Sequence, residues 1–187
     1  MHSNRNKINI LISREVFLYV PLLLLVIPLR FLLSFMVAAA VHEMFHIAAI
    51  CMLKIPINSF QIGIHGMVIE THSMSMKQEF LCAAAGPLGG LALLLFLRKI
   101  PLIAVIGIIQ SLYNLLPMYP TDGGRILKCV MNMAFSEKTA DKLVNNIEIL
   151  IQSAIVGCCI FATVWLSLGI LPMVFGATVL RKWLIRK

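Results

Sequence analysis

Two histidines and one glutamate stand together in an apolar stretch of the chain. In the 23 residues from Phe31 to Leu53 the only formal charge is that of Glu43, which His42 and His46 flank. Residues i and i+4 share one face of a helix, so a helix here brings the two imidazoles together with the carboxylate beside them. Two histidines at this spacing can hold one zinc ion, and the glutamate can serve as a base. The pattern predicts a zinc hydrolase site.

The same three residues could instead form a hydrogen-bonded polar cluster that holds neighbouring membrane helices together. Ionisable side chains inside a membrane helix are costly, and where they occur they mark functional sites by default. A cluster that only joins helices seldom needs a carboxylate and two imidazoles within five residues. The metal site is therefore the favoured interpretation.

A catalytic zinc ion usually takes three protein ligands and leaves its fourth position to water, so a third ligand must come from elsewhere in the chain. The chain has two aspartates. Asp141 lies in a cationic segment, where Lys138 and Lys142 are its expected solvated partners. Asp122 is the candidate ligand.

Asp122 is expected on irregular backbone. Pro117 and Pro120 precede it and end a helix, and the pair Gly123-Gly124 follows it and permits a tight turn. Irregular backbone at membrane depth is tolerated where it is buried in protein or lines a wet cavity. The alternative is a plain helix exit, in which Asp122 caps a following helix that begins at Arg125.

The composition excludes a soluble globular domain. Hydrophobic residues make up 60% of the 187 residues and charged residues 13%, and the mean hydropathy is +0.93. Soluble chains carry about 25% charged residues. The net charge of +8 does not indicate nucleic-acid binding, because lysines and arginines stand in short groups between apolar runs. The five cysteines form no CxxC motif and are expected to be free thiols.

The apolar runs predict about six membrane-spanning helices and a single membrane domain, 1–187, whose motif-bearing core is about 31–135. The spans are expected at about 15–30, 31–53, 80–97, 100–121, 144–167 and 169–185. Within the third span, Gly86 and Gly90 are interpreted as residues for close helix packing. We expect neither a PDZ-like insertion nor an appended regulatory domain, and no secretory signal.

The distribution of cations predicts the orientation. An even number of spans places both termini on one side, and an N-inside arrangement leaves Arg30, Arg98 and Lys99 outside and the other 13 of the 16 lysines and arginines inside. The positive-inside rule therefore predicts that both termini are cytoplasmic.

The connection between the second and third spans is long and predicts a small β-hairpin. Apolar residues alternate in Phe60–Ile64 and Met67–Thr71, on either side of His65-Gly66. An unpaired edge of this hairpin could hold an unwound substrate as an added strand; the alternative is a plain interfacial loop. The expected fold class is an all-α integral membrane protein with this hairpin between spans 2 and 3.

Three motifs together resemble the site-2 protease family of intramembrane zinc metalloproteases. They are HEMFH at 42–46, AAAGPLGG at 83–90 and NLLPMYPTDGG at 114–124, in the order and spacing of that family. The short loops most resemble the branch that contains the stage IV sporulation protein FB, without its C-terminal regulatory domain.

The resemblance implies a role for each matching residue. His42, His46 and Asp122 match the zinc ligands, Glu43 matches the catalytic glutamate, and Asn114 matches an asparagine that contacts substrate near the metal. One Zn²⁺ per chain is the implied cofactor. The implied partners are the lipid bilayer, a membrane-protein substrate with a transmembrane segment, and an inhibitory or activating membrane protein; nucleic acid is not among them.

The implied activity is hydrolysis of peptide bonds within or beside transmembrane segments, in the regulated intramembrane proteolysis of a transcription-factor precursor or an anti-sigma-type protein. One alternative is an inactive membrane chaperone or regulator, against which the intact Glu43 argues. Another is a divalent-cation transporter, but transporters tend to have related halves with paired broken helices, and the sequence has no such repeat.

Overall fold

The structure is a computed structural model, and it describes residues 9–12, 27–63, 66–71, 74–166, 169, 172–173 and 176–179. The chain divides into two compact units, Met1–Leu116 and Pro117–Lys187, and each is described by itself. Most of the predicted first span, and most of the sixth, lie outside the described residues.

Helix α2, Leu29–Met52, carries the two histidines. Its buried residues follow one another at intervals of four: Ser34, Ala38, His42, His46 and Ile50. Residues four apart share a face, so this stripe faces the rest of the unit while the other sides of α2 stay apolar and exposed. The helix ends where Lys54 adopts a positive φ of 53° and the N–H of Ile55 donates to the carbonyl of Ile50 over 3.0 Å.

Helix α3, Met76–Ala92, begins with a capping box. The side chain of Ser75 accepts from the N–H of Gln78, and the side chain of Gln78 accepts from the N–H of Ser75. The helix continues into a short 3₁₀ helix, η1, Leu93–Phe96. The buried face of α3 consists of small residues and one proline, namely Cys82, Ala83, Gly86, Pro87, Gly89 and Gly90.

Helix α4, Pro101–Asn114, starts with a proline at its first position, where the missing N–H costs nothing. The sequence predicted a span that continues to Thr121, but the helix stops at Asn114. The proline at position 117 lacks an N–H and disfavours helical backbone in the residue before it, which accounts for the early end.

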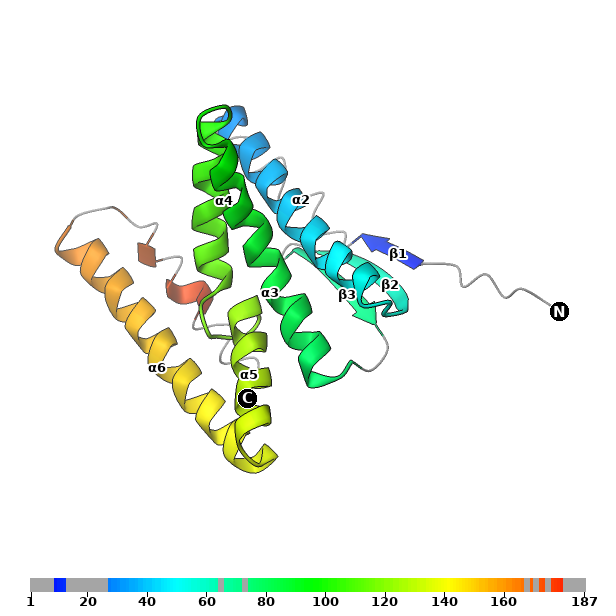
Figure 1. The fold of residues 1–187 in the computed structure, drawn as a ribbon. Coiled ribbons are helices and arrows are strands. Elements are labelled where there is room, and N and C mark those ends of the chain that lie inside the picture. The colour runs from blue at the N-terminus through cyan, green and yellow to red at the C-terminus, as the bar shows by residue number, and fades with distance from the viewer. Residues whose placement is uncertain are drawn as a thin grey trace. The chain divides into compact units, whose positions relative to one another are not determined.

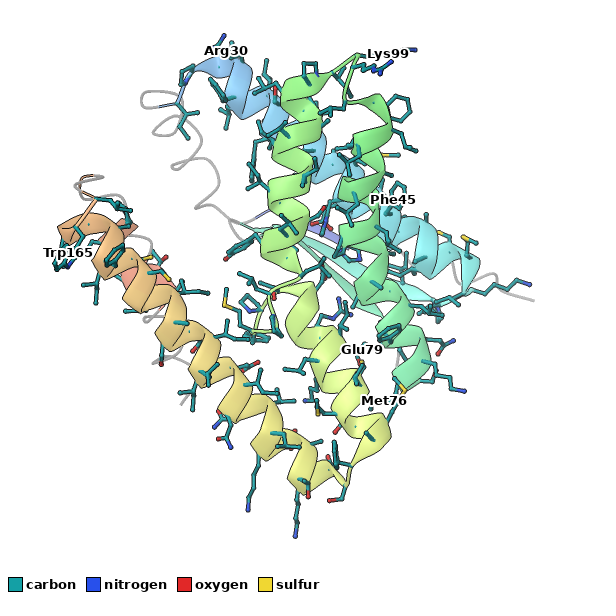
Figure 2. All side chains as sticks on the ribbon, turned by 60° about the vertical axis from the view of Figure 1, so that its left-hand side comes forward. Arg30, Phe45, Met76, Glu79, Lys99 and Trp165 are labelled. Carbon is teal, nitrogen blue, oxygen red and sulfur yellow. The ribbon has the colours of Figure 1, made fainter. Side chains whose placement is uncertain are left out.

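The three helices pack against one another in every pairing, and Figure 1 shows them side by side. Glycines permit the close approach. A Cβ atom at Gly89 would lie 2.6 Å from Cγ of Phe45, and one at Gly90 would lie 2.8 Å from the carbonyl oxygen of Gly107. The interpretation of Gly90 as a packing residue is thereby confirmed. In Figure 2, Arg30 and Lys99 stand at one end of these helices, and Met76 and Glu79 at the other.

A three-stranded sheet completes the first unit. Its strands are β1 (Asn9–Ile12), β2 (Ile57–Gly63) and β3 (Gly66–Thr71), in the order β1-β2-β3. Strands β2 and β3 pair antiparallel, and β1 pairs parallel to β2. Figure 1 places the sheet beside the C-terminal half of α2.

The sequence analysis predicted a two-stranded hairpin and did not predict strand β1. A parallel partner some 50 residues away leaves no local signal, because alternation within four residues does not identify the strand with which they pair.

The second unit contains helices α5, Asp122–Ala134, and α6, Glu137–Val164, which pack together and are joined through Phe135 and Ser136. The N-cap of α5 is Thr121, so Asp122 is the first helical residue and does not cap a helix from Arg125. Helix α6 begins seven residues before the predicted span 144–167. Its buried residues again stand four apart, at Ala140, Val144, Glu148 and Gln152.

Within the part of the chain that the structure describes, three helical stretches are long and apolar enough to cross a membrane: Leu29–Met52, Met76–Phe96 and Glu137–Val164. Helix α4 is apolar but shorter. Large apolar side chains on their outer faces are exposed, among them Met44 on α2, Leu88 on α3 and Leu150 on α6. Such faces suit a lipid environment, and the chain has the character of a helical membrane protein.

Candidate metal centre

The two imidazoles predicted to bind metal lie together on the buried stripe of α2. His42 is 4% exposed and His46 is 8% exposed. Their Nε2 atoms are 3.2 Å apart, and the rings meet edge to face with an interplanar angle of 82°. Two nitrogens bound at about 2.0–2.1 Å to one tetrahedral zinc ion would be about 3.4 Å apart. The observed separation fits a shared ion.

The hydrogen bond of His46 to helix α3 fixes which of its nitrogens carries hydrogen. Its Nδ1 lies 2.7 Å from the carbonyl oxygen of Cys82, and a carbonyl oxygen can only accept. Nδ1 is therefore the donor, and in the neutral ring Nε2 presents a lone pair towards His42. Histidines that bind metals are commonly oriented by such a hydrogen bond from the second ring nitrogen.

Asn114, predicted to lie near the metal, contacts His42 from the end of α4. Its Nδ2 lies 3.3 Å from Nε2 of His42. When this amide donates, Nε2 of His42 is also an acceptor, and two lone pairs then face each other across 3.2 Å. Neutral imidazoles in this arrangement repel unless a cation lies near both nitrogens. The donor set of the first unit therefore fits a bound metal ion.

Gly86 is the residue of α3 that packs against the two imidazoles. A Cβ atom there would collide with Nε2 of His46 and would lie 2.7 Å from Cε1 of His42. Its absence lets the backbone of α3 come close enough for the Cys82 carbonyl to reach Nδ1 of His46. The sequence identified Gly86 as a packing residue and missed that it packs against the metal site, because spacing within one helix does not show what lies opposite.

Glu43, the predicted catalytic base, follows His42 on α2 and is half-buried. One residue along a helix corresponds to a rotation of about 100° and a rise of about 1.5 Å, so Glu43 lies beside the buried stripe at the level of the imidazoles. Placing a carboxylate at this depth in an apolar helix costs free energy, and residues of this kind usually have a function.

In the second unit, Asp122 occupies a buried position at the start of α5, with 8% exposure. The N-cap Thr121 accepts from the N–H of Gly124 over 3.4 Å and donates its hydroxyl to the carbonyl of Met118 over 2.6 Å. Nη1 of Arg125 lies 4.0 Å from Oδ1 of Asp122. Asp122 therefore lies at the positive end of the α5 helix dipole with a guanidinium beside it, which is a favourable place for a carboxylate.

The sequence analysis missed Glu148, a carboxylate with 5% exposure on α6. Its Oε1 accepts from the N–H of Tyr119 over 3.0 Å. A signal was present, since Glu148 directly precedes the apolar run from Ile149 and stands at four-residue spacing from Ala140 and Val144.

No family model and no curated protein sequence matches the chain. Among solved structures, the chain is similar to the site-2 protease from Methanocaldococcus jannaschii, with a TM-score of 0.65 and 20% sequence identity. The match covers 96% of this chain and 90% of that one. The chain therefore has a fold like that of a site-2 protease, as the three sequence motifs predicted.

Proposed function

We propose that the chain is an intramembrane zinc metalloprotease, which hydrolyses peptide bonds within or beside transmembrane segments of other membrane proteins. The observation that carries the proposal is the His42–His46 pair. Both rings are buried in an apolar helix, their Nε2 atoms are 3.2 Å apart, and the carbonyl of Cys82 orients His46 for metal binding. The site-2 protease fold supports the same function.

In this proposal His42, His46 and Asp122 hold one Zn²⁺. They offer two ring nitrogens and one carboxylate oxygen, and catalytic zinc sites commonly use three such ligands and keep a fourth position open. The assignment of Asp122 rests on its donor chemistry, on its buried place at the start of α5, and on its place in the NLLPMYPTDGG motif. Zinc bound there supplies a Lewis acid that polarises a carbonyl group and acidifies water.

Two further side chains complete the proposed chemistry. Glu43 takes a proton from the attacking water on its carboxylate and passes that proton to the leaving amine. Asn114, whose amide lies 3.3 Å from Nε2 of His42, binds the substrate backbone next to the scissile bond. An amide suits this task because an unwound peptide presents both donors and acceptors.

The depth of the site defines where substrates are cut. Eight residues separate His46 from Lys54, which corresponds to roughly 12 Å along a helix. In the proposed topology, with six spans and both termini in the cytoplasm of a bacterial cell, the metal lies that far below the cytoplasmic boundary. Cleavage is therefore proposed near the cytoplasmic end of the substrate's transmembrane helix.

The sheet offers a place for the unwound substrate. Among the described residues, β3 pairs only with β2, which leaves its other edge open to an added strand. The substrates we propose are membrane-bound precursors of transcription factors or anti-sigma-type proteins, as in the branch that contains the stage IV sporulation protein FB. An inhibitory or activating membrane protein would control their cleavage.

Cleavage of a model membrane substrate by the purified protein tests this function. The variant Glu43→Gln keeps the size and hydrogen bonding of the side chain but removes the base. It should retain zinc while activity falls by orders of magnitude, as measured by metal analysis and by product formation in the same preparation. Cleavage that persists undiminished in Glu43→Gln would overturn the proposal.

A further inference from the structure

Glu148 is an ionisable group on a helix that is apolar enough to cross a membrane. It belongs to the buried stripe of α6, one turn from Val144 and one turn from Gln152. Removing a carboxylate from water is costly unless hydrogen bonds compensate, and a leucine would fill such a position at lower cost. A function beyond packing is therefore expected of Glu148.

The carboxylate of Glu148 binds a segment of backbone that lies outside the helices. Oε1 of Glu148 accepts from the N–H of Tyr119 over 3.0 Å. Tyr119 lies in the segment 117–121 between α4 and α5, where Pro117 and Pro120 have no N–H to donate. Only Met118, Tyr119 and Thr121 carry an amide hydrogen there, and that of Thr121 donates to the carbonyl of Met118.

The same segment is tied to the first turn of α5, where Asp122 stands. The hydroxyl of Thr121 donates to the carbonyl of Met118 over 2.6 Å and accepts from the N–H of Gly124. A Cβ atom at Gly124 would lie 2.6 Å from the Met118 oxygen, so the segment rests directly on the helix. A bond that fixes Tyr119 therefore also fixes the backbone that presents Asp122.

We propose that Glu148 is a positioning residue, which holds the segment 117–121 through the N–H of Tyr119 and thereby sets the position of the Asp122 carboxylate. The effect on metal binding rests on the proposed function, in which Asp122 is a zinc ligand. The hold on Tyr119 does not depend on that function.

Amide hydrogen exchange of the full-length protein in detergent, with and without added zinc, tests the hold directly. Because prolines give no signal, a peptide that covers 117–121 reports on three amides only. Glu148→Leu should raise the exchange rate at Tyr119 by about tenfold or more, whereas Glu148→Gln, which keeps an acceptor oxygen, should stay close to the wild type. The control is Gln152→Leu, which removes another buried polar group from the same stripe and should leave Tyr119 unchanged.

Zinc affinity then tests the link to Asp122. Glu148→Leu should weaken zinc binding by about 10- to 100-fold, the range found for groups that orient metal ligands, and Glu148→Gln should restore most of it. In the Asp122→Ala background, Glu148→Leu should have no further effect, because the ligand that it positions is gone.

Each outcome has a definite meaning. Unchanged exchange at Tyr119 in Glu148→Leu overturns the proposal. Equal weakening of zinc binding by Glu148→Leu with and without Asp122 overturns the link between the two carboxylates. Wild-type zinc affinity in Asp122→Ala refutes the ligand assignment, and the positioning of a ligand by Glu148 falls with it, while exchange at Tyr119 still decides whether Glu148 holds the segment.

Discussion

The imidazole of His46 on α2 donates its Nδ1 hydrogen to the carbonyl oxygen of Cys82 on α3, across 2.7 Å. This bond joins two helices and at the same time leaves Nε2 free of hydrogen for a metal ion. Substitution of the Cys82 side chain cannot remove the acceptor, since it belongs to the backbone. The orientation of His46 therefore depends on the position of α3.

Replacing any of the three proposed ligands should lower the zinc content. His42→Ala, His46→Ala and Asp122→Ala each remove one donor, and metal analysis of the purified proteins should show a clear loss while the proteins still insert into the membrane. Asp141→Ala is the matched control, because it removes the other aspartate, which is exposed on α6. Full zinc content in Asp122→Ala would mean that the third ligand lies elsewhere.

Gly86→Ala should damage the metal site without unfolding the helices. The new Cβ atom would collide with Nε2 of His46 and would displace either the imidazoles or α3. A shift of about 1 Å is expected to cost about 100-fold in activity, and zinc affinity should fall with it. Cleavage kinetics measures the loss of activity, zinc titration measures the affinity, and circular dichroism shows whether the helices remain folded.

The control for this variant is Gly157→Ala on α6, where no atom lies within 4 Å of the added Cβ. Alanine is the better helix former, so this change should leave activity intact and stability equal or slightly higher, by up to about 1 kcal/mol. Similar activity in the two variants would contradict the role of Gly86.

Asn114→Leu should impair catalysis more than metal binding. The amide at the end of α4 is replaced by an apolar group of similar size, so a substrate backbone loses a partner beside His42. We expect kcat/KM to fall by about 10- to 100-fold with the zinc content retained. Gln110→Leu, one turn earlier on α4, should have a much smaller effect. A loss of zinc in Asn114→Leu that accounts for the whole fall in activity would refute a role in substrate binding.

Reporter fusions test the proposed topology. With six spans, a reporter after Lys187 lies in the cytoplasm, and a reporter within the Arg98–Lys99 turn lies on the opposite side. An extracytoplasmic reading after Lys187 would mean five spans.

Unwinding of the substrate helix should limit the rate of cleavage. Helical carbonyls are engaged in hydrogen bonds, and exposing them in lipid is costly. Glycine, proline or asparagine placed one turn from the scissile bond should therefore speed cleavage, and an uninterrupted leucine stretch should slow it. Mass spectrometry of the products gives both rate and position. Cuts at the extracytoplasmic end, or rates that ignore these residues, would refute this path of access.

The sequence predicted those features that depend on residues close together in the chain. The spacing of His42 and His46 on one helix follows from helix geometry. The prolines at 117 and 120 likewise indicated irregular backbone before Asp122, although the predicted span was drawn to Thr121 and α4 ends at Asn114. The apolar runs likewise identified the helices that can cross a membrane, although α4 is shorter than its run of uncharged residues.

What the sequence did not show depends on contacts between distant segments. The acceptor for His46 is a backbone carbonyl, and every residue has one, so Cys82 has no distinguishing mark in the sequence. Strand β1 depends on a partner beyond the second helix. Glu148 was missed although it directly precedes an apolar run, and the bond that gives it a role joins it to Tyr119, 29 residues earlier.

The stripe on α2 also has a mechanical consequence. Four residues turn a helix by about 400°, so successive members of the stripe rotate by about 40° and wind slowly around the axis. Near the start of the stripe, Ala38 packs with Ala104 of α4, and His42 contacts Asn114 of the same helix. Farther along, His46 donates a hydrogen bond to the carbonyl of Cys82 on α3, and Ile50 packs beside that cysteine. The two imidazoles thus lie where α2 contacts both neighbours, and each has a hydrogen-bond contact with a different helix. A metal ion held between them would fix the two rings relative to each other, and through these contacts it would resist displacement of α3 or of α4 along α2.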